Sequence, residues 1–277
     1  MLERISAPFW ELQSRQWAQL KAPLRPSPED VHIVEQAIGD WRDARGRAPR
    51  ALVLGSTFEL AALRWPERSQ VVAIDRVHGM LRGVWFQAPP TSGIRRGVVG
   101  HWLDMPLADR CCDLVLGDGS FASVRPGDGR TLSRAIRRVL QDDGLVLLRF
   151  FVRPFPDEDP ETVWADSMAG LIGSFAAFKL RLLMALQVQD GEVCVHEAWR
   201  FVHARITSLE QLARATGWGI EEVTTIEAYR DQPTSYWFPT LAEVRAALEE
   251  DFIEQSCCWP SYELGGSCPT FLLAPRP

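Results

Sequence analysis

The sequence lacks the long apolar segments and the one-sided charge that mark several classes of protein. Its longest nearly apolar stretch, residues 168–178, is about half as long as a membrane-spanning helix. The first residues already include a charged side chain at Glu3 and contain no apolar core like that of a signal peptide. The formal net charge is −6, and the 30 Lys and Arg residues are spread along the chain. We therefore expect a cytoplasmic protein with neither a membrane nor nucleic acid as its partner.

Cysteine motifs for metal ions are also missing. Cys111–Cys112 and Cys257–Cys258 are adjacent pairs, Cys194 and Cys268 stand alone, and no Cys-x-x-Cys spacing occurs. Neighbouring side chains on a strand point to opposite faces, so an adjacent pair cannot easily ligate one ion. We expect reduced structural thiols and no metal site.

The N-terminal part, residues 1–46, predicts helices. Apolar residues at positions 9, 12, 17 and 20 come first, and a Pro-rich break follows. Residues 27–30, Ser-Pro-Glu-Asp, form a strong helix start, with a Ser cap, Pro in the first helical position and acids near the positive end of the helix. We predict a second helix over about 28–45.

From residue 49 onward, short aliphatic and β-branched runs alternate with helical stretches. This alternation is typical of a parallel sheet with crossover helices, whose strands are buried on both faces. The predicted strands are 50–54, 70–75, 96–101, 112–117 and 144–151. The predicted helices between them are 57–65, 77–85 and 129–140.

The strand–helix rhythm stops after residue 151 and resumes near residue 239 with a helix and a final pair of strands. For the intervening part we predict one long helix over about 160–187, a strand or extended linker over 192–203, and helices over 207–216 and 219–230. The chain therefore divides into three parts. They are an N-terminal helical lid (1–46), an α/β core (47–151 and 239–277) and an inserted cap (152–238).

Two turns of the predicted sheet carry the clearest functional signal. Gly55 follows the first strand, where a glycine lets the backbone approach a ligand and where the next helix begins. Asp75 ends the second strand, about 20 residues later, and is placed to accept hydrogen bonds from both hydroxyls of a ribose. Ligands of open α/β sheets bind outside the carboxyl ends of the strands, so the two turns predict a nucleoside site.

The glycines that a dinucleotide requires are absent from the first turn. Gly55 is followed by Ser56, Thr57, Phe58 and Glu59, whereas a dinucleotide site needs Gly-x-Gly-x-x-Gly. The Glu59 carboxylate would repel a phosphate. It could instead meet a cation, such as the ammonium group of an amino-acid tail, or cap backbone donors.

Four segments in this order resemble the motifs of class I S-adenosylmethionine-dependent methyltransferases. They are VLGSTFEL, IDRVHGML, GHWLDMPLADRCCDLVLGDGSF and VLQDDGLVLLRFF, and together they cover residues 50–151. The resemblance implies a Rossmann-like, mostly parallel sheet of seven strands in the order 3-2-1-4-5-7-6. It also implies S-adenosylmethionine as the cofactor.

The resemblance further implies which residues hold the methionine part and the ribose of the cofactor. Gly55, Ser56, Thr57 and Glu59 of the first turn would line the methionine part, and Asp75 would bind the ribose. The turn departs from the family pattern, because Gly-Ser-Thr-Phe-Glu stands in place of the usual Gly-x-Gly-x-Gly.

Contacts to the adenine and to the sulfonium are implied in the same way. Arg76 and Met80 would cover the adenine faces, and His101 and Trp102 would flank its edge, with His101 standing where the family usually has Asp or Asn. The two residues implied beside the sulfonium and the amino group are Gly117 and Asp118.

The sequence favours a small molecule as the methyl acceptor. The signature of Asn or Asp followed by two prolines and an aromatic residue, which marks N-methylation of adenine or glutamine, is absent after the fourth strand. The sequence contains 11 Trp residues, and an aromatic-rich cap would suit a planar or apolar acceptor. The residues we expect in the acceptor pocket are Trp17, Phe175, Phe178 and Tyr236, beside Trp10; core packing would explain these aromatic residues equally well.

We assign no catalytic residue from the sequence. A base is needed only if the acceptor arrives protonated, and the candidates are His196, His203 and Tyr236, each of which could equally be structural. Two alternatives stay open. One is a non-catalytic or divergent protein that binds S-adenosylmethionine or S-adenosylhomocysteine, and the other is a nicotinamide-dependent oxidoreductase, which the missing glycines disfavour.

Overall fold

The computed structural model describes residues 7–188 and 191–277 and contains a sheet of seven strands. The strands are β1 (Arg50–Leu54), β2 (Gln70–Asp75), β3 (Ile94–Val99), β4 (Cys112–Asp118), β5 (Leu140–Arg149), β8 (Phe252–Cys258) and β9 (Thr270–Pro275). Their order is β3-β2-β1-β4-β5-β9-β8. Strand β9 runs in the opposite direction to the other six strands of this sheet. Because β8 and β9 are the sixth and seventh strands of this sheet, the predicted order 3-2-1-4-5-7-6 is confirmed.

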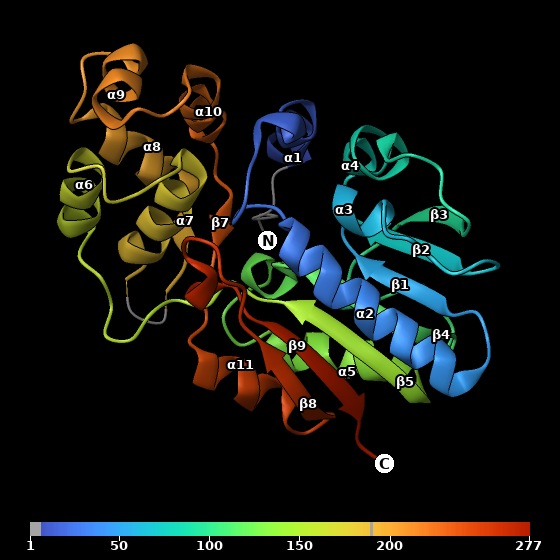
Figure 1. Ribbon diagram of the computed structural model, residues 1–277. Coiled ribbons are helices and arrows are strands. Elements are labelled where there is room, and N and C mark those ends of the chain that lie inside the picture. The colour runs from blue at the N-terminus through green and yellow to red at the C-terminus, as the bar shows by residue number, and fades with distance from the viewer. Residues whose placement is uncertain (1–6, 189–190) are drawn as a thin grey trace.

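Helices cover both faces of the sheet (Figure 1). One face packs against α2 (Pro28–Arg45), α3 (Phe58–Ala61) and α4 (His78–Gly83), and the other packs against α5 (Gly129–Val139) and α11 (Leu241–Leu248). The central strands β1 and β4 are buried almost throughout, as their uninterrupted aliphatic sequences predict. The sheet therefore forms a three-layer α/β core.

The local signals in the sequence explain where α2 begins and ends. Ser27 caps the helix by accepting a hydrogen bond from the Asp30 backbone N–H at 3.2 Å, and the Asp30 carboxylate accepts one in return from the Ser27 N–H. Pro28 takes the first helical position, and Gly46 ends the helix with a φ of +63°. The helix predicted over 28–45 is confirmed.

The inserted segment (152–238) contains more and shorter helices than the sequence predicted. Its helices are α6 (Pro160–Met168), α7 (Phe175–Leu186), α8 (Val195–His203), α9 (Leu209–Thr216) and α10 (Ile220–Thr224), followed by the 3₁₀ helix η4 (Thr225–Tyr229). The single helix predicted over 160–187 is wrong, because Gly170 takes a φ of +73° and Ser174 caps a new helix. Most of the segment predicted as a strand or linker over 192–203 is helix α8.

The inserted helices share a hydrophobic core with the N-terminal helix α1 (Ala7–Arg15). Phe9 of α1 is fully buried in this core, while α1 also contacts α4 of the sheet domain. A two-stranded sheet of β6 (Val193–Cys194) and β7 (Ser235–Tyr236) joins the middle of the inserted segment to its end. In Figure 1, α1 lies between the inserted helices and α4.

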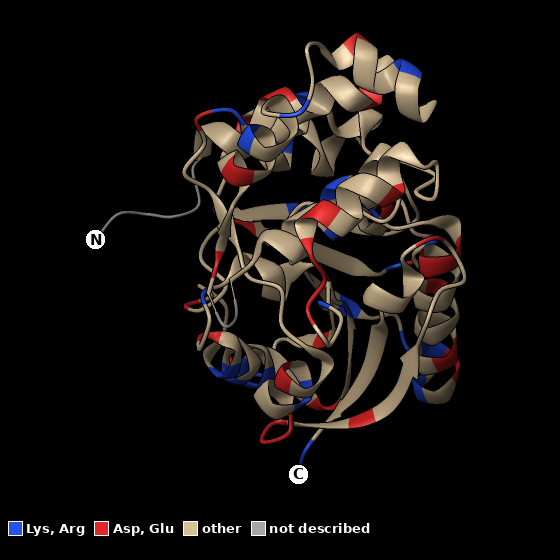
Figure 2. Cartoon of the chain, turned by 90° about the vertical axis from the view of Figure 1, so that its left-hand side faces the viewer, with Lys and Arg blue, Asp and Glu red and all other residues tan. Residues whose placement is uncertain are grey.

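Charged side chains of both signs are mixed over the molecule. Figure 2 shows Asp and Glu interspersed with Lys and Arg along the helices, and neither sign forms a continuous band in this view. Within the described residues, no helix is both long enough and apolar enough to span a membrane. All six cysteines are free thiols.

Candidate active site

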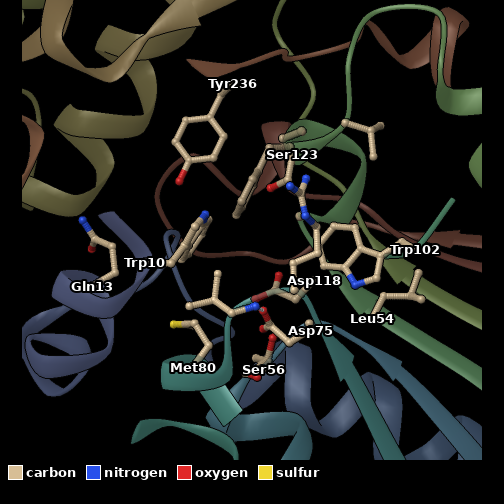
Figure 3. Close-up of a pocket in the computed structure, with 18 of the residues that line it drawn as sticks. Trp10, Gln13, Leu54, Ser56, Asp75, Met80, Trp102, Asp118, Ser123 and Tyr236 are labelled. Carbon is tan, nitrogen blue, oxygen red and sulfur yellow. Dashed lines mark hydrogen bonds between the residues drawn. The ribbon is translucent and has the colours of Figure 1, made fainter. Parts of the chain in front are cut away.

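A cavity of about 440 Å³ opens at the carboxyl ends of β1, β2 and β4. Its lining comes from three parts of the chain: the ends of strands β1 to β5 with the turns that follow them, the segment from α1 to residue 24, and the inserted segment (Figure 3). Such a volume is typical of small-molecule sites. The cavity therefore lies where the sequence predicts a nucleoside site, at the edge where ligands of open α/β sheets bind.

Asp75 lies in the wall of this cavity with only 8% of its surface exposed. Its Oδ1 accepts a hydrogen bond from the Val77 backbone N–H at 2.8 Å, which fixes the carboxyl group at the end of β2. Burial raises the pKa of Asp75, and the hydrogen bond from Val77 opposes this rise. A carboxylate held in this way can accept hydrogen bonds from a neighbouring pair of hydroxyls.

The first-strand turn presents bare backbone to the cavity at Gly55. This residue has a φ of +87°, and its N–H donates to the Ile74 carbonyl at 2.8 Å. A Cβ at this position would lie 3.2 Å from the Trp102 ring, whose Nε1 donates to the same Ile74 carbonyl at 2.8 Å. Gly55 and Trp102 therefore shape the cavity together, and a side chain at position 55 would crowd the indole.

Asp118 ends β4 at the floor of the cavity and is paired with a buried cation. The Arg149 Nε donates to Asp118 Oδ1 at 2.7 Å, and Arg149 also donates to the Tyr262 hydroxyl at 2.9 Å and the Pro23 carbonyl at 3.0 Å. Burial alone would lower the pKa of Arg149, but the Asp118 carboxylate raises it above its usual range. The pair links two strands of the core to the segment that leads into α2.

Two residues implied by the family resemblance do not line the cavity. Glu59 faces Arg25, whose Nε donates to Glu59 Oε1 at 2.5 Å, so the cation that meets Glu59 belongs to the chain itself. Burial raises the pKa of Glu59, and the Arg25 charge opposes this. Gly117 is set back in β4, where a Cβ would lie 2.8 Å from the Leu148 side chain. The other implied residues, which line the cavity, are Gly55, Ser56, Thr57, Asp75, Arg76, Met80, His101, Trp102 and Asp118.

Opposite the turns that hold Gly55 and Asp75, aromatic rings from distant segments line the cavity. Trp10 of α1 meets Tyr236 of β7 edge to face, with ring centroids 6.4 Å apart and planes at 81°. Phe238 lies 6.0 Å from Tyr236 and also lines the cavity. Trp17, which follows α1, lines the cavity and packs near Met80 of α4. The structure thus brings Trp10, Trp17 and Tyr236 together as the sequence predicts.

Phe175 and Phe178 lie elsewhere, and the prediction that they line the acceptor pocket is not met. Both rings are fully buried in the core of the inserted segment, stacked on each other at 5.8 Å and packed against Trp218 at 5.5 and 5.2 Å. Helix α7 instead contributes Leu180 and Leu183 to the cavity. Leu180 and Leu183 lie on a different face of α7 from Phe175 and Phe178, whose face packs into the core of the inserted segment.

The histidine candidates for a base lie away from the cavity. His203 Nε2 is 2.7 Å from a Glu227 carboxylate oxygen, and His196 Nδ1 accepts a hydrogen bond from the Asp231 backbone N–H at 3.1 Å. Both therefore act as structural groups. Tyr236 does line the cavity, but burial raises its pKa well above its usual value, so its hydroxyl is a neutral hydrogen-bond donor near pH 7.

Several residues of the cavity escaped the sequence reasoning. Gln13 follows Trp10 by three positions and therefore shares its helix face, a spacing that could have identified it. Tyr229 and Phe151 carry no comparable signal, because each looks like an ordinary core residue. Arg125 and Asp128 lie in the loop before α5, and their place in the cavity depends on the tertiary fold.

Residues 52–148 match the family model described as "Methyltransferase domain". The chain is also similar in fold to the CcbJ methyltransferase from Streptomyces caelestis, with 11% identity, coverage of 99% of this chain and 100% of that one, and a TM-score of 0.54. A SAM-dependent methyltransferase from Methanosarcina mazei is 15% identical over 83% of this chain and 92% of its own, with a TM-score of 0.50. No curated protein matches the sequence.

The fold similarity extends to a protein of another assigned activity. A candidate Zn-dependent alcohol dehydrogenase from Rhodobacter sphaeroides is 13% identical, with 98% of both chains covered and a TM-score of 0.60. At this identity the likeness concerns the fold alone. Within residues 7–188 and 191–277, no group of three or more His, Cys, Asp or Glu side chains is placed to hold a metal ion. The family match and the strand order confirm the resemblance to class I S-adenosylmethionine-dependent methyltransferases.

Proposed function

We propose that this chain, which carries a methyltransferase domain, transfers the methyl group of S-adenosylmethionine to a small molecule. The observation that carries this proposal is the position of Asp75. Its buried carboxylate ends β2 beside the Gly55 turn of β1, and both residues line one cavity at the carboxyl edge of the sheet. This arrangement supports recognition of a ribose next to a turn that has no room for a pyrophosphate-binding glycine loop.

The residues present fit an adenosyl cofactor. Asp75 Oδ1 is engaged by the Val77 N–H at 2.8 Å, and the carboxylate has further lone pairs for the two ribose hydroxyls. Met80, Trp102 and the exposed His101 surround the space next to Asp75 and would hold the adenine. The turn of Gly55 to Thr57 and the Asp118 carboxylate would hold the methionine part.

The pairing of Asp118 with Arg149 affects how the sulfonium would be held. Because Arg149 already balances the Asp118 charge at 2.7 Å, the carboxylate presents a hydrogen-bonding oxygen and little net charge to the cavity. The Trp10 ring, which lines the cavity, would provide the remaining attraction for a positive centre, whereas the Phe151 ring already packs under the Arg149 guanidinium at 5.1 Å.

The chain's own residues would bind, orient and dehydrate the reactants. Bound S-adenosylmethionine would supply an electrophilic methyl group, whose bond to sulfur breaks as the acceptor's lone pair forms the new bond. The α1 segment and the inserted segment both line the cavity at the carboxyl edge of the sheet and would exclude water from the bound reactants. Catalysis would then depend mainly on alignment, since no histidine of the inserted segment reaches the cavity.

The same proposal assigns a role to each of the three parts of the chain. Residues 47–151 and 239–277 would hold the cofactor, residues 1–46 would act as a lid, and residues 152–238 would form a cap over the acceptor. Support comes from the lining of the cavity, to which all these parts except the C-terminal segment contribute side chains.

Thermal-shift measurements with S-adenosylmethionine, S-adenosylhomocysteine, NAD⁺ and NADP⁺ test the proposed cofactor. We expect both adenosyl compounds to raise the melting temperature and the nicotinamide compounds to leave it unchanged. Stabilisation by NAD⁺ or NADP⁺ alone would favour an oxidoreductase. Release of S-adenosylhomocysteine during incubation with S-adenosylmethionine and an acceptor then separates an enzyme from a protein that only binds the cofactor.

A further inference from the structure

The cavity wall contributed by α1 holds a buried amide whose nitrogen has no hydrogen-bond partner among the described residues. Gln13 of α1 lines the cavity with 5% of its surface exposed. The Gln16 side chain donates to Gln13 Oε1 at 3.0 Å, whereas Gln13 Nε2 has no hydrogen-bond partner in the part of the chain that the structure describes. An unpaired buried donor costs about 1–3 kcal/mol, so its place in a cavity wall points to a ligand atom that accepts from it.

Two further donors belong to residues that line the cavity. Trp17 Nε1 is buried and has no partner among the described residues. The Tyr236 hydroxyl likewise makes no hydrogen bond to any described residue, and in Figure 3 it points toward Trp10. All three groups donate, and none of them carries a charge near pH 7. These groups therefore offer hydrogen bonds to the lone pairs of a ligand oxygen and supply no positive charge to balance an anionic one.

The shape of the wall complements this chemistry. Trp10 lies one helical turn before Gln13, so its indole and the Gln13 amide share one face of α1. Tyr236 completes the wall. Its ring meets the Trp10 ring edge to face, with centroids 6.4 Å apart and planes at 81°. Rings in this arrangement form an apolar corner, in which an aromatic ligand can lie against the face of one ring and meet the other edge to face.

The charged residues of the cavity lie in other segments. Asp75 and Asp118 end strands β2 and β4, and Arg76 follows Asp75 directly. Arg125 and Asp128 carry opposite charges in the loop before α5. Glu192 lines the cavity from the inserted segment and has an interaction partner of its own. The wall formed by Trp10, Gln13, Trp17 and Tyr236 thus selects by ring contact and uncharged hydrogen bonds.

We propose that the methyl acceptor is an uncharged planar conjugated compound with a carbonyl oxygen, which lies against Trp10 and Tyr236 and accepts a hydrogen bond from Gln13 Nε2. This inference rests on the proposed methyltransferase function and names the substrate class for it. Gln13 is the specificity-determining residue, because its Nε2 recognises the oxygen that distinguishes this class from plain aromatic rings.

Binding of a matched pair of compounds tests the proposal. Quinolin-4-one has the required carbonyl oxygen, and quinoline has the same ring size without it. Calorimetric titration of each compound into the protein saturated with S-adenosylhomocysteine should show tighter binding of quinolin-4-one. Gln13→Leu should weaken quinolin-4-one binding about tenfold, the effect of one lost hydrogen bond of about 1.4 kcal/mol, and should leave quinoline binding unchanged.

Two variants provide the controls. Gln13→Glu keeps the size of the side chain, replaces the donor by an acceptor and should weaken quinolin-4-one binding at pH 8. Gln19→Leu changes an exposed glutamine of the same segment and should change neither affinity. Each variant should bind S-adenosylhomocysteine within twofold of the wild type, which shows that the fold is intact.

The outcomes separate this inference from the proposed function. Equal affinity for quinolin-4-one and quinoline, an unchanged affinity in Gln13→Leu, or no binding of quinolin-4-one to the cofactor-saturated protein would overturn the acceptor class. Failure of the wild type to bind S-adenosylhomocysteine at all would instead overturn the methyltransferase proposal.

Discussion

Arg149 and Asp118 form a buried ion pair across the adjacent strands β5 and β4, with 2.7 Å between the Arg149 Nε and Asp118 Oδ1 atoms. Arg149 also donates to the Pro23 carbonyl at 3.0 Å, so the same guanidinium contacts the segment between α1 and α2. The pair thus connects that segment with the Asp118 carboxylate in the cavity wall.

Removing one partner of this pair should destabilise the protein strongly. Arg149→Met leaves the Asp118 carboxylate buried without its counter-charge, and we expect a loss of about 3–5 kcal/mol in the free energy of unfolding. The double variant Arg149→Met with Asp118→Leu should recover part of this loss, because the Asp118 charge is removed as well; the buried Asp30 carboxylate, 3.7 Å from the Arg149 guanidinium, keeps the recovery incomplete. Urea denaturation of both variants measures the difference. If the single variant is as stable as the double one, the ion pair does not carry the stability assigned to it.

Asp75 should control cofactor affinity. Asp75→Ala removes the hydrogen bonds to the ribose hydroxyls and should weaken binding of S-adenosylhomocysteine about tenfold or more, since a charge-assisted hydrogen bond contributes about 1.5–3 kcal/mol. Asp104→Asn changes an exposed acid near the cavity and should leave the affinity unchanged. Calorimetric titration compares the variants, and equal dissociation constants for wild type and Asp75→Ala would remove Asp75 from the site.

A pH series tests the same residue in a second way. Burial raises the pKa of Asp75, and the carboxylate form is the one that accepts from both hydroxyls. Affinity for S-adenosylhomocysteine should therefore fall as the pH drops through this raised pKa, at a higher pH than for an exposed aspartate. The ratio of wild-type to Asp75→Ala affinity isolates this effect. A ratio that stays constant down to pH 4 would contradict it.

Gly55→Ala should reduce both stability and cofactor affinity. Gly55 has a φ of +87°, and a Cβ would lie 3.2 Å from the Trp102 ring. Gly127 provides a matched control, because its φ is +89° and a Cβ there would meet nothing within 4 Å. Gly127→Ala should show only the backbone cost of about 1 kcal/mol, with unchanged cofactor affinity. Equal affinities for S-adenosylhomocysteine in the two variants would argue against a ligand at the Gly55 turn.

The buried Lys179 should make stability depend on pH. Its Nζ donates to Thr225 Oγ1 at 2.7 Å between the rings of Phe175 and Tyr229, and burial lowers its pKa to about 7 from an ordinary 10.5. Between these two pH values the unfolded chain binds the extra proton, so the free energy of unfolding should rise with pH across this window.

The comparison with Lys179→Met isolates this contribution. The variant should be more stable than the wild type at pH 6.5, and its advantage should shrink as the pH rises toward 10. Lys21→Met, at the other lysine of the chain, changes an exposed side chain and should show no such trend. Urea denaturation at several pH values measures both variants. A Lys179→Met advantage that does not change with pH would contradict the burial effect.

The sequence predicted the sheet well because its signals are local and repeated. The buried strands β1 and β4 read as continuous aliphatic runs, and Gly55 and Asp75 mark the strand ends at which the cavity opens. The order of the strands followed from the family resemblance. These features depend on short segments whose neighbours in space are fixed by the parallel topology.

The inserted segment was harder to predict because its apolar pattern does not show where one helix ends. Phe175 and Phe178 share a helical stripe with Leu182, and the pattern cannot distinguish a core from a pocket. The pairing of Glu59 with Arg25 joins residues 34 positions apart, and no local signal predicts it. Positions of this kind depend on tertiary packing rather than on sequence spacing.

A crystal structure of the protein with S-adenosylhomocysteine tests the central claim most directly. The account predicts the ribose hydroxyls on the Asp75 carboxylate, the adenine beside Met80 and Trp102, and the sulfur near Asp118 facing Trp10. The ligand bound outside this cavity, or bound within it with no contact between its ribose and Asp75, would contradict the account.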